Sequence, residues 1–402
     1  MKLKRWLLVL FVVLLIVIGC QGLNRSETMP EEVRAVWVSY IEYSSMLNGR
    51  DESSFRTEVQ TMFENLKTLN FNTVYVHASA FTDAFYRSDF YPWSSYAAGT
   101  LGQDPGFDPL AIMAEEADRA GFQIEAWINP LRSFRSDQLE DIPADCVIGQ
   151  WLRDPEIRGT WIVNVNDRWY LNPAYPQVRE LIASVARELA GGYKIDGLHM
   201  DDYFYPEGIS ENFDAAAYQQ YLQEGGSMTL SQWRKDNVNQ MVKAIYSAVK
   251  EQNPTLRVGI SPAGNMEYAV QSIYGDVREW AQNEGYVDYL APQIYFGYEH
   301  GTLPFDDCLN QWKELVQDTG TELIVGLAAY KINTEDHYAK QGRYEWQQNS
   351  DILSRQIDQI QQDDAVRGYA VFSYNSLFHP SEENAQQVSQ ELQNLIELMG
   401  RP

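Results

Sequence analysis

The segment KIDGLHMDDYFYP, residues 194–206, places two adjacent carboxylates between an apolar run and three aromatic rings. The apolar run has the composition of a buried strand, so Asp201 and Asp202 stand at its end. Two carboxylates cannot both be buried and ionised without partners, so we expect separated pKa values or a balancing cation such as Arg132 or Lys331. Pairs of this kind are what general acid and base chemistry requires. The segment is therefore the leading candidate for a catalytic site.

Alternation along the same strand assigns directions to its side chains. Leu198 and Met200 share one face, while His199 and Asp201 share the other and should point into the same interior. For His199 the alternative is a core histidine with both ring nitrogens hydrogen-bonded, and its place at a strand end favours a site role. One of the two aspartates is also expected to cap the next segment or bind loop backbone.

Other chemistries lack their signatures in this sequence. It contains no Gly-rich phosphate loop and no GxSxG, HExxH or CxxC motif. With 5 His, a histidine-rich metal site is not expected, although an oxygen-ligand cation among the carboxylates stays open. The formal charge of -25 repels phosphate backbones, so we expect no nucleic-acid partner. We also expect no cofactor and a monomeric protein.

The elements that would position these residues follow a repeating pattern. Eight runs rich in Val, Ile, Leu and Tyr alternate with segments of helical spacing, which predicts a parallel sheet covered by helices. Eight such units along one chain favour an α/β fold, a closed (β/α)8 barrel that forms a single domain. Long connections at 79–110, 130–172 and 203–229 would build a substrate site. The predicted strands are 33–40, 73–78, 123–129, 196–202, 257–262, 289–295, 323–330 and 368–374.

In this architecture the active site lies at the C-terminal ends of the strands. Polar side chains gather at those ends: Ser39, Tyr40 and Glu42; His77; Asn129 and Arg132; His199, Asp201 and Asp202; Gln293, Tyr295 and Glu299; Tyr330 and Lys331; Ser373, Tyr374 and Asn375. We expect substrate contacts from Glu42, His77, Asn129, Arg132, His199, Tyr203, Tyr205, Gln293, Tyr295 and Lys331. Rings that can stack on sugar faces would line the groove, with Trp37, Trp127, Tyr203, Tyr205 and Tyr295 as candidates and the core as the alternative for the two tryptophans.

The N-terminus has the form of an export signal. Lys2, Lys4 and Arg5 precede an apolar stretch, residues 6–18, that is too short for a comfortable membrane span. It ends in VIGC, which resembles the lipobox of bacterial lipoproteins. We predict a signal peptide over 1–19, a lipidated Cys20 starting a tether over 20–31, and a barrel with a C-terminal helix over 32–402. An ordinary signal peptide or a single N-terminal anchor is the alternative.

Sequence motifs at the strand ends are similar to those of a known family. The segments EEVRAVWVSY, FNTVYVHASAFTDAFYRSDFYPWS, IEAWINPLR, YKIDGLHMDDYFYP, VGISPAGN, DYLAPQIYFGYEH and GLAAYKI resemble the glycosyl-hydrolase-like 10 family of exported bacterial proteins. The resemblance implies a glycosidase of the cell envelope, since a similar family member acts on peptidoglycan glycan strands stripped of their stem peptides. Combined with the lipobox, it implies an extracytoplasmic protein anchored to the membrane by lipid.

Glycoside cleavage normally uses two carboxyl groups across the scissile bond. Asp201 and Asp202 should point to different sides of a strand, so we expect one of them, Asp202 or Asp201, to act with a carboxylate from another strand end. Glu299 is the first candidate and Glu42 the second. An N-acetyl sugar that supplies its own carbonyl as nucleophile is a further possibility. The alternative functions are a non-catalytic glycan-binding lipoprotein and an envelope scaffold that binds a protein partner.

Overall fold

The computed structural model describes residues 32–400 of the 402-residue chain. The predicted signal peptide, the tether and Cys20 lie outside the described residues. They therefore stay predictions. Among residues 32–400, no helix is long and apolar enough to cross a lipid bilayer.

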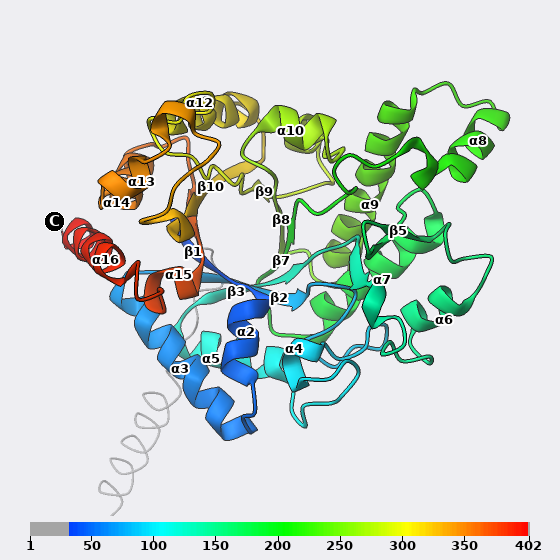
Figure 1. Ribbon diagram of the computed structural model, residues 1–402, viewed down its shortest axis with the longest axis horizontal. Coiled ribbons are helices and arrows are strands. Elements are labelled where there is room, and N and C mark those ends of the chain that lie inside the picture. Colours follow the sequence, from blue (N-terminus) through cyan, green and yellow to red (C-terminus); the bar gives the residue numbers. More distant parts are fainter. Residues whose placement is uncertain (1–31, 401–402) are drawn as a thin grey trace, which may run out of the picture. The chain divides into compact units, whose positions relative to one another are not determined.

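Eight parallel strands close into a barrel, which confirms the predicted (β/α)8 fold (Figure 1). Around the barrel the order is β1-β11-β10-β9-β8-β7-β3-β2, and β1 pairs in parallel with both β11 and β2. Each predicted run supplies one strand. The strands are β1 (Val33–Val38), β2 (Thr73–Ser79), β3 (Gln123–Ile128), β7 (Gly197–Asp201), β8 (Arg257–Ser261), β9 (Tyr289–Leu290), β10 (Glu322–Ala328) and β11 (Gly368–Phe372).

Side chains alternate between the barrel interior and the helix layer. The interior is filled by a cluster that includes Trp37, Tyr75, Trp127 and Tyr289. Their sequence neighbours, such as Val36 and Val74, point outward into the larger core beneath the helices. Because both faces of each strand are buried, the strands read as continuous apolar runs.

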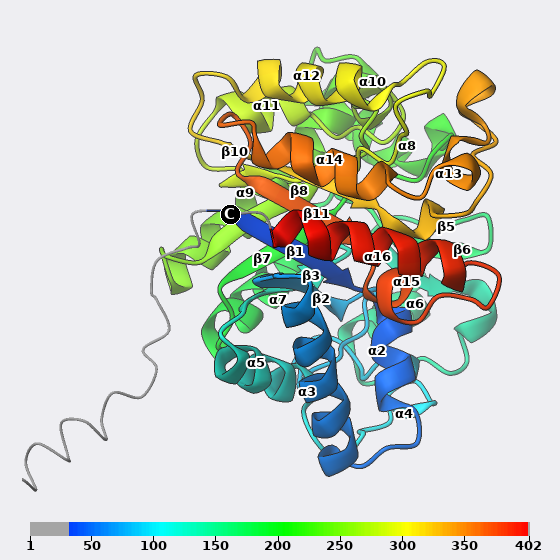
Figure 2. The ribbon, with the colours of Figure 1, turned by 90° about the vertical axis from the view of Figure 1, so that its left-hand side faces the viewer.

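Amphipathic helices cover the barrel, as Figures 1 and 2 show. In α3 the Asp51 side chain caps the start by accepting the Ser54 backbone N–H at 2.8 Å. The Glu391 carboxylate of α16 accepts the Ser354 backbone N–H of α14 at 2.6 Å, which holds the C-terminal helix beside its neighbour. The longer helices are α3 (Glu52–Thr68), α5 (Pro109–Ala120), α7 (Pro176–Gly192), α9 (Leu230–Gln252), α12 (Phe305–Val316), α14 (Ile352–Gln361) and α16 (Ala385–Met399). Shorter ones are α2 (Tyr40–Leu47), α4 (Ser95–Ala98), α6 (Val147–Arg153), α8 (Ala215–Gln223), α10 (Met266–Gln271), α11 (Val277–Gln282), α13 (Glu345–Gln348) and α15 (Tyr374–Phe378).

The connection over 130–172 contains a small sheet that the sequence does not predict. Its antiparallel strands β4 (Arg132–Arg135), β6 (Arg168–Leu171) and β5 (Ile162–Val165) lie in that order. A two-residue turn joins β5 to β6, and Asn166 and Asp167 both have positive φ there, at 50° and 61°. Residues of this type tolerate the left-handed backbone that tight hairpins need. The sheet follows β3, so it stands at the C-terminal end of the barrel strands, which we call the mouth.

Candidate active site

Asp201 is the last residue of β7 and its side chain is only 2% exposed. Its Oδ1 accepts the Tyr203 backbone N–H at 3.2 Å, as expected for one member of the pair. Its Oδ2 has no hydrogen-bond partner among residues 32–400. Burial raises the pKa of Asp201 well above its usual value, and the neighbouring Asp202 raises it further. Both effects favour the protonated form of Asp201.

Asp202 lies one residue beyond the strand and is half-buried. Its Oδ1 accepts a hydrogen bond from Gln293 Nε2 at 3.2 Å, and the same Nε2 donates to the Ser261 backbone oxygen at 2.9 Å. Burial raises the pKa of Asp202 to about 6, against the lowering effect of the Gln293 bond. The amide thus joins the ends of β7 and β8 to the segment after β9. A carboxyl group with this pKa can both release and accept a proton near neutral pH.

Arg132 and Tyr203 stand beside the carboxylates. The Arg132 guanidinium lies over the Tyr203 ring, 4.4 Å from its centroid, and over the Phe81 ring at 5.1 Å. Tyr203 is 46% exposed, so one part of its ring is open to a ligand. After β9 and β10, the rings of Tyr295 and Tyr330 meet edge to face, with 5.7 Å between their centroids. Tyr203 and the Tyr295–Tyr330 pair give the mouth flat faces of the kind that stack on sugars.

His199 lies deeper, in the barrel interior, and is fully buried. Its Nε2 is 3.1 Å from Trp37 Nε1 and its Nδ1 is 2.7 Å from the Tyr289 hydroxyl. An indole N–H only donates, so Nε2 accepts from Trp37 and Nδ1–H donates to Tyr289. Burial lowers the pKa of His199 well below its usual value. The ring also stacks on Tyr75, so its observed contacts are those of a neutral core histidine.

His77 and Asn129 hold the loops of the mouth together. His77 Nδ1 accepts the Tyr40 backbone N–H at 3.0 Å, so its Nε2–H donates to Asn129 Oδ1 at 3.2 Å. Asn129 in turn donates to the Ala80 backbone oxygen at 3.2 Å. Burial lowers the pKa of His77 to about 3, which keeps the ring neutral. The His77 ring stacks on Trp127 in the barrel interior.

Glu42 and Lys331 are engaged by the protein itself. The Glu42 carboxylate accepts the Ser39 backbone N–H at 2.7 Å in a capping box, and also binds the Ser373 hydroxyl and the Asn375 backbone N–H. It thereby ties the start of α2 to the end of β11. Lys331 Nζ donates to the Tyr295 backbone oxygen at 2.7 Å and pairs with Asp336 at 2.5 Å. Neither group carries a free charge toward the Asp201–Asp202 pair.

Three predicted ring positions are corrected by their burial. Tyr205 is 1% exposed and packs edge to face on Phe213 and Tyr274, so it does not line the groove. Trp37 and Trp127 are 1% and 5% exposed and belong to the barrel interior, as their core alternative states. Tyr203, two residues earlier, is 46% exposed, and its place in the groove stays a prediction.

Glu299, the first candidate partner, is exposed on the segment that follows β9. Its backbone N–H donates to Glu345 Oε2 at 2.9 Å. Within the described part of the chain, no hydrogen bond or ion pair links its carboxylate to Asp201 or Asp202. The structure therefore does not bring Glu299 into the hydrogen-bonded cluster, and its catalytic role stays a prediction.

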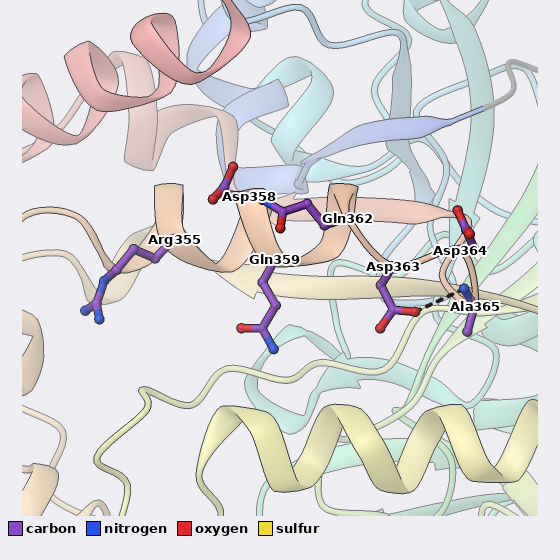
Figure 3. A pocket seen from close by; sticks show the side chains of 7 residues that line it. All are labelled: Arg355, Asp358, Gln359, Gln362, Asp363, Asp364 and Ala365. Carbon is purple, nitrogen blue, oxygen red and sulfur yellow. Dashed lines mark hydrogen bonds between the residues drawn. The ribbon is translucent and has the colours of Figure 1, made fainter. Parts of the chain in front are cut away.

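Hollows elsewhere on the surface lie apart from this cluster. One of about 680 Å3 is lined by Arg355, Asp358, Gln359, Gln362, Asp363, Asp364 and Ala365, shown in Figure 3. These residues belong to α14 and the turn that enters β11. A smaller hollow of about 260 Å3 on the mouth side includes Tyr330 and Asn375. No group of three or more His, Cys, Asp or Glu within 32–400 is arranged to hold a metal ion.

Arg168 is a mouth residue that sequence reasoning misses. It enters from β6, and its guanidinium lies 4.7 Å from the Phe81 ring centroid. The β5–β6 hairpin, which the sequence does not predict, brings Arg168 to the mouth, since no barrel strand ends near residue 168. An arginine in a long insertion gives no periodic signal that could reveal its position.

Comparison with solved structures supports the barrel fold. The glycoside hydrolase domain of PgaB (BpsB) from Bordetella bronchiseptica is 16% identical, with a TM-score of 0.54 over 89% of this chain and 98% of that one. Alpha-L-fucosidase isoenzyme 2 from Paenibacillus thiaminolyticus is 15% identical, with a TM-score of 0.55 over 92% of this chain and 49% of that one. At these identities the likeness concerns the fold alone.

Sequence comparisons identify the family. Glycosyl hydrolase YngK from Bacillus subtilis (strain 168) is 35% identical over 331 residues, which are 75% of this chain and 61% of YngK. Glycosyl hydrolase DigH from Escherichia coli (strain K12) is 28% identical over 391 residues, 88% of this chain and 86% of DigH. This chain thus spans less than two thirds of YngK and most of DigH. The model of the family described as Glycosyl hydrolase-like 10 matches residues 32–344, and this chain belongs to that family.

Proposed function

We propose that this protein is an exported lipoprotein that hydrolyses glycosidic bonds of a cell-envelope polysaccharide, with peptidoglycan glycan strands as the substrate. The observation that carries the hydrolase assignment is Asp202, a half-buried carboxyl group whose pKa is raised to about 6 at the mouth of the barrel. Family membership and the names of YngK and DigH support it. The substrate is inferred from the resemblance of the sequence to a family member that acts on peptidoglycan glycan strands stripped of their stem peptides.

In this proposal Asp202 transfers the proton at the glycosidic oxygen. Its orientation is fixed by Gln293, and its pKa near 6 leaves a protonated fraction available near neutral pH. Burial and the neighbouring Asp202 both favour the protonated form of Asp201, which avoids a second negative charge next to Asp202. Asp201 also orients Tyr203 by accepting its backbone N–H. Asp201 thus acts as a positioning group for the carboxylate and the ring.

The second group of the reaction comes from outside the Asp201–Asp202 pair. An N-acetyl sugar can use its own carbonyl oxygen as nucleophile, and the enzyme then needs only the acid and a shaped site. Glu299 is the protein group that serves instead if the enzyme supplies the carboxylate. Glu42 is disfavoured because four donors from Ser39, Ser373 and Asn375 already occupy its oxygens.

A turnover assay separates the candidate functions. We would incubate the detergent-solubilised full chain with amidase-treated peptidoglycan, whose strands lack stem peptides, and measure soluble sugar fragments by chromatography. A hydrolase releases fragments with time. A glycan-binding lipoprotein sediments with the strands and releases none, and a scaffold for a protein partner does neither.

A further inference from the structure

Two guanidinium groups meet over one ring at the mouth. Arg132 of β4 and Arg168 of β6 lie 5.1 Å and 4.7 Å from the Phe81 ring centroid. Both side chains are half-buried. Their strands are paired in the antiparallel sheet, so the sheet fixes the spacing of the two cations.

Neither guanidinium forms an ion pair with any carboxylate in the described range. Arg168 donates to the Ser133 backbone oxygen at 2.6 Å, and Arg132 lies against the Tyr203 ring. Nearby Arg135, in contrast, is paired with Asp137 at 3.4 Å. The chain has 56 acidic and 31 basic residues, so two neighbouring cations without a carboxylate partner are unexpected.

The electrostatics of the two arginines favours a bound anion. Burial and the charge of Arg132 both lower the pKa of Arg168. Asp201 interacts with the charge of Arg132, but its raised pKa disfavours the ionised form that would balance the two cations. An anion that enters the mouth would relieve this repulsion and accept hydrogen bonds from both forks.

The surroundings suit a sugar ring. The Tyr40 ring meets Phe81 at 5.0 Å and Tyr96 at 4.8 Å, both edge to face. Tyr96 is 37% exposed and Tyr203 is 46% exposed. The cations thus stand among aromatic faces and next to the Asp201–Asp202 pair.

We propose that Arg132 and Arg168 together bind a carboxylate carried by a sugar of the substrate. This inference rests on the proposed hydrolase function and deepens it. Arginine suits the role because its planar fork matches the two oxygens of a carboxylate. The carboxylate can be the lactyl ether group of a muramyl sugar or the C6 carboxylate of a uronic acid. A stem peptide converts the lactyl carboxylate into an amide, so the pair would select stripped strands.

The test compares two forms of one substrate. Amidase-treated glycan strands carry free lactyl carboxylates, and carbodiimide coupling with ammonia converts these into neutral amides. We expect the wild-type protein to bind and cleave the acidic strands about 10- to 100-fold better, the range for charge-assisted hydrogen bonds. Arg132→Gln and Arg168→Gln should raise KM for acidic strands more than they lower kcat, and should abolish the preference. Arg132→Lys should restore part of it.

Controls separate binding from folding. Arg135→Gln, which removes an ion-paired and 59% exposed arginine of β4, should keep the preference. If Arg168→Gln unfolds the hairpin, shown by a lower Tm, Arg132→Gln and Arg132→Lys carry the test. Polyuronate oligosaccharides, added as competitors, assign the carboxylate to a uronic acid if they inhibit more strongly than muramyl fragments.

Two failures are distinguishable. If the wild-type protein treats acidic and amidated strands equally in binding and cleavage, the carboxylate inference is wrong, while the hydrolase assignment stands. If neither substrate is cleaved, the hydrolase assignment is wrong, and titration calorimetry with both strands still decides the inference. Equal affinity for the two strands, or unchanged affinity in Arg132→Gln, would then overturn it.

Discussion

The Gln293 side chain donates from Nε2 to Oδ1 of Asp202 at 3.2 Å, across the ends of two different barrel strands. The same nitrogen donates to the Ser261 backbone oxygen, so the amide cannot rotate freely. A hydrogen bond to the ionised form of a carboxyl group lowers its pKa, while burial raises it. The pKa of about 6 for Asp202 results mainly from burial, which raises it, while the Gln293 bond and a backbone hydrogen bond lower it. Gln293 therefore orients the carboxyl group and lowers its proton affinity.

Replacing Gln293 by Leu should shift the pH profile of the enzyme. The change removes the bond that favours the ionised carboxylate, so the pKa of Asp202 should rise above about 6. The pH dependence of kcat/KM should move to higher pH by the same amount, because it reports the free enzyme. Gln359→Leu is the matched control, since Gln359 donates to Asp306 at 2.8 Å on the outside of the barrel. An unmoved profile in a folded Gln293→Leu protein would count against this assignment.

Tyr203 and Tyr205 should respond in opposite ways to truncation. Tyr203 is 46% exposed beside Arg132, so Tyr203→Ala should weaken glycan binding and change Tm little. Tyr205 is 1% exposed among Phe213 and Tyr274, so Tyr205→Ala should lower the free energy of unfolding by about 3–5 kcal/mol. Thermal unfolding and a glycan pull-down measure both effects. Equal losses of Tm in the two variants would place Tyr203 in the core as well.

Cys20 carries the predicted lipid anchor. Changing Cys20 to Ala should release the protein into the aqueous fraction or leave its precursor unprocessed, because the lipidated residue would be lost. Fractionation of cells with detection of the chain measures this. A variant that still sediments with membranes through an uncleaved N-terminal segment would contradict the lipoprotein prediction.

The barrel could be predicted because each strand is buried on both faces. Runs such as residues 73–78 read as continuous apolar segments, and helices such as α3 show regular apolar spacing. Eight such units predict a closed barrel whose active site lies at the C-terminal ends of the strands. Asp201 and Asp202 stand at one of these ends. This part of the site depends only on local pattern and topology.

The remaining site depends on contacts between distant segments. Burial of His199 follows from Trp37 and Tyr289, which are 162 and 90 residues away in sequence. Glu42 is occupied by Ser373 and Asn375 from the other end of the chain. Arg168 reaches the mouth only through the hairpin of the four-residue strands β5 and β6. Such pairings leave no periodic trace in one sequence.

Three carboxylates differ in their expected importance for turnover. Asp201→Asn keeps the volume of the buried side chain, so it should lower kcat less than Asp202→Asn does, through a changed position of Tyr203. Glu299→Gln should come next in severity if the protein supplies the second carboxylate. If the substrate supplies its own carbonyl, Glu299→Gln should leave kcat nearly unchanged. Comparing kcat of Glu299→Gln with that of the wild type decides whether the protein or the substrate supplies the second group.

The central claim is that Asp202 transfers the proton in glycoside cleavage. The direct measurement is the initial rate of fragment release from amidase-treated peptidoglycan by Asp202→Asn, with Tm and circular dichroism as checks of folding. Asparagine keeps the shape and the bond to Gln293 but cannot exchange a proton, and loss of a positioned acid or base costs about 10²- to 10⁴-fold in rate. We expect a fall of that size in a folded protein. A folded Asp202→Asn variant that releases fragments at nearly the wild-type rate would contradict the proposed mechanism.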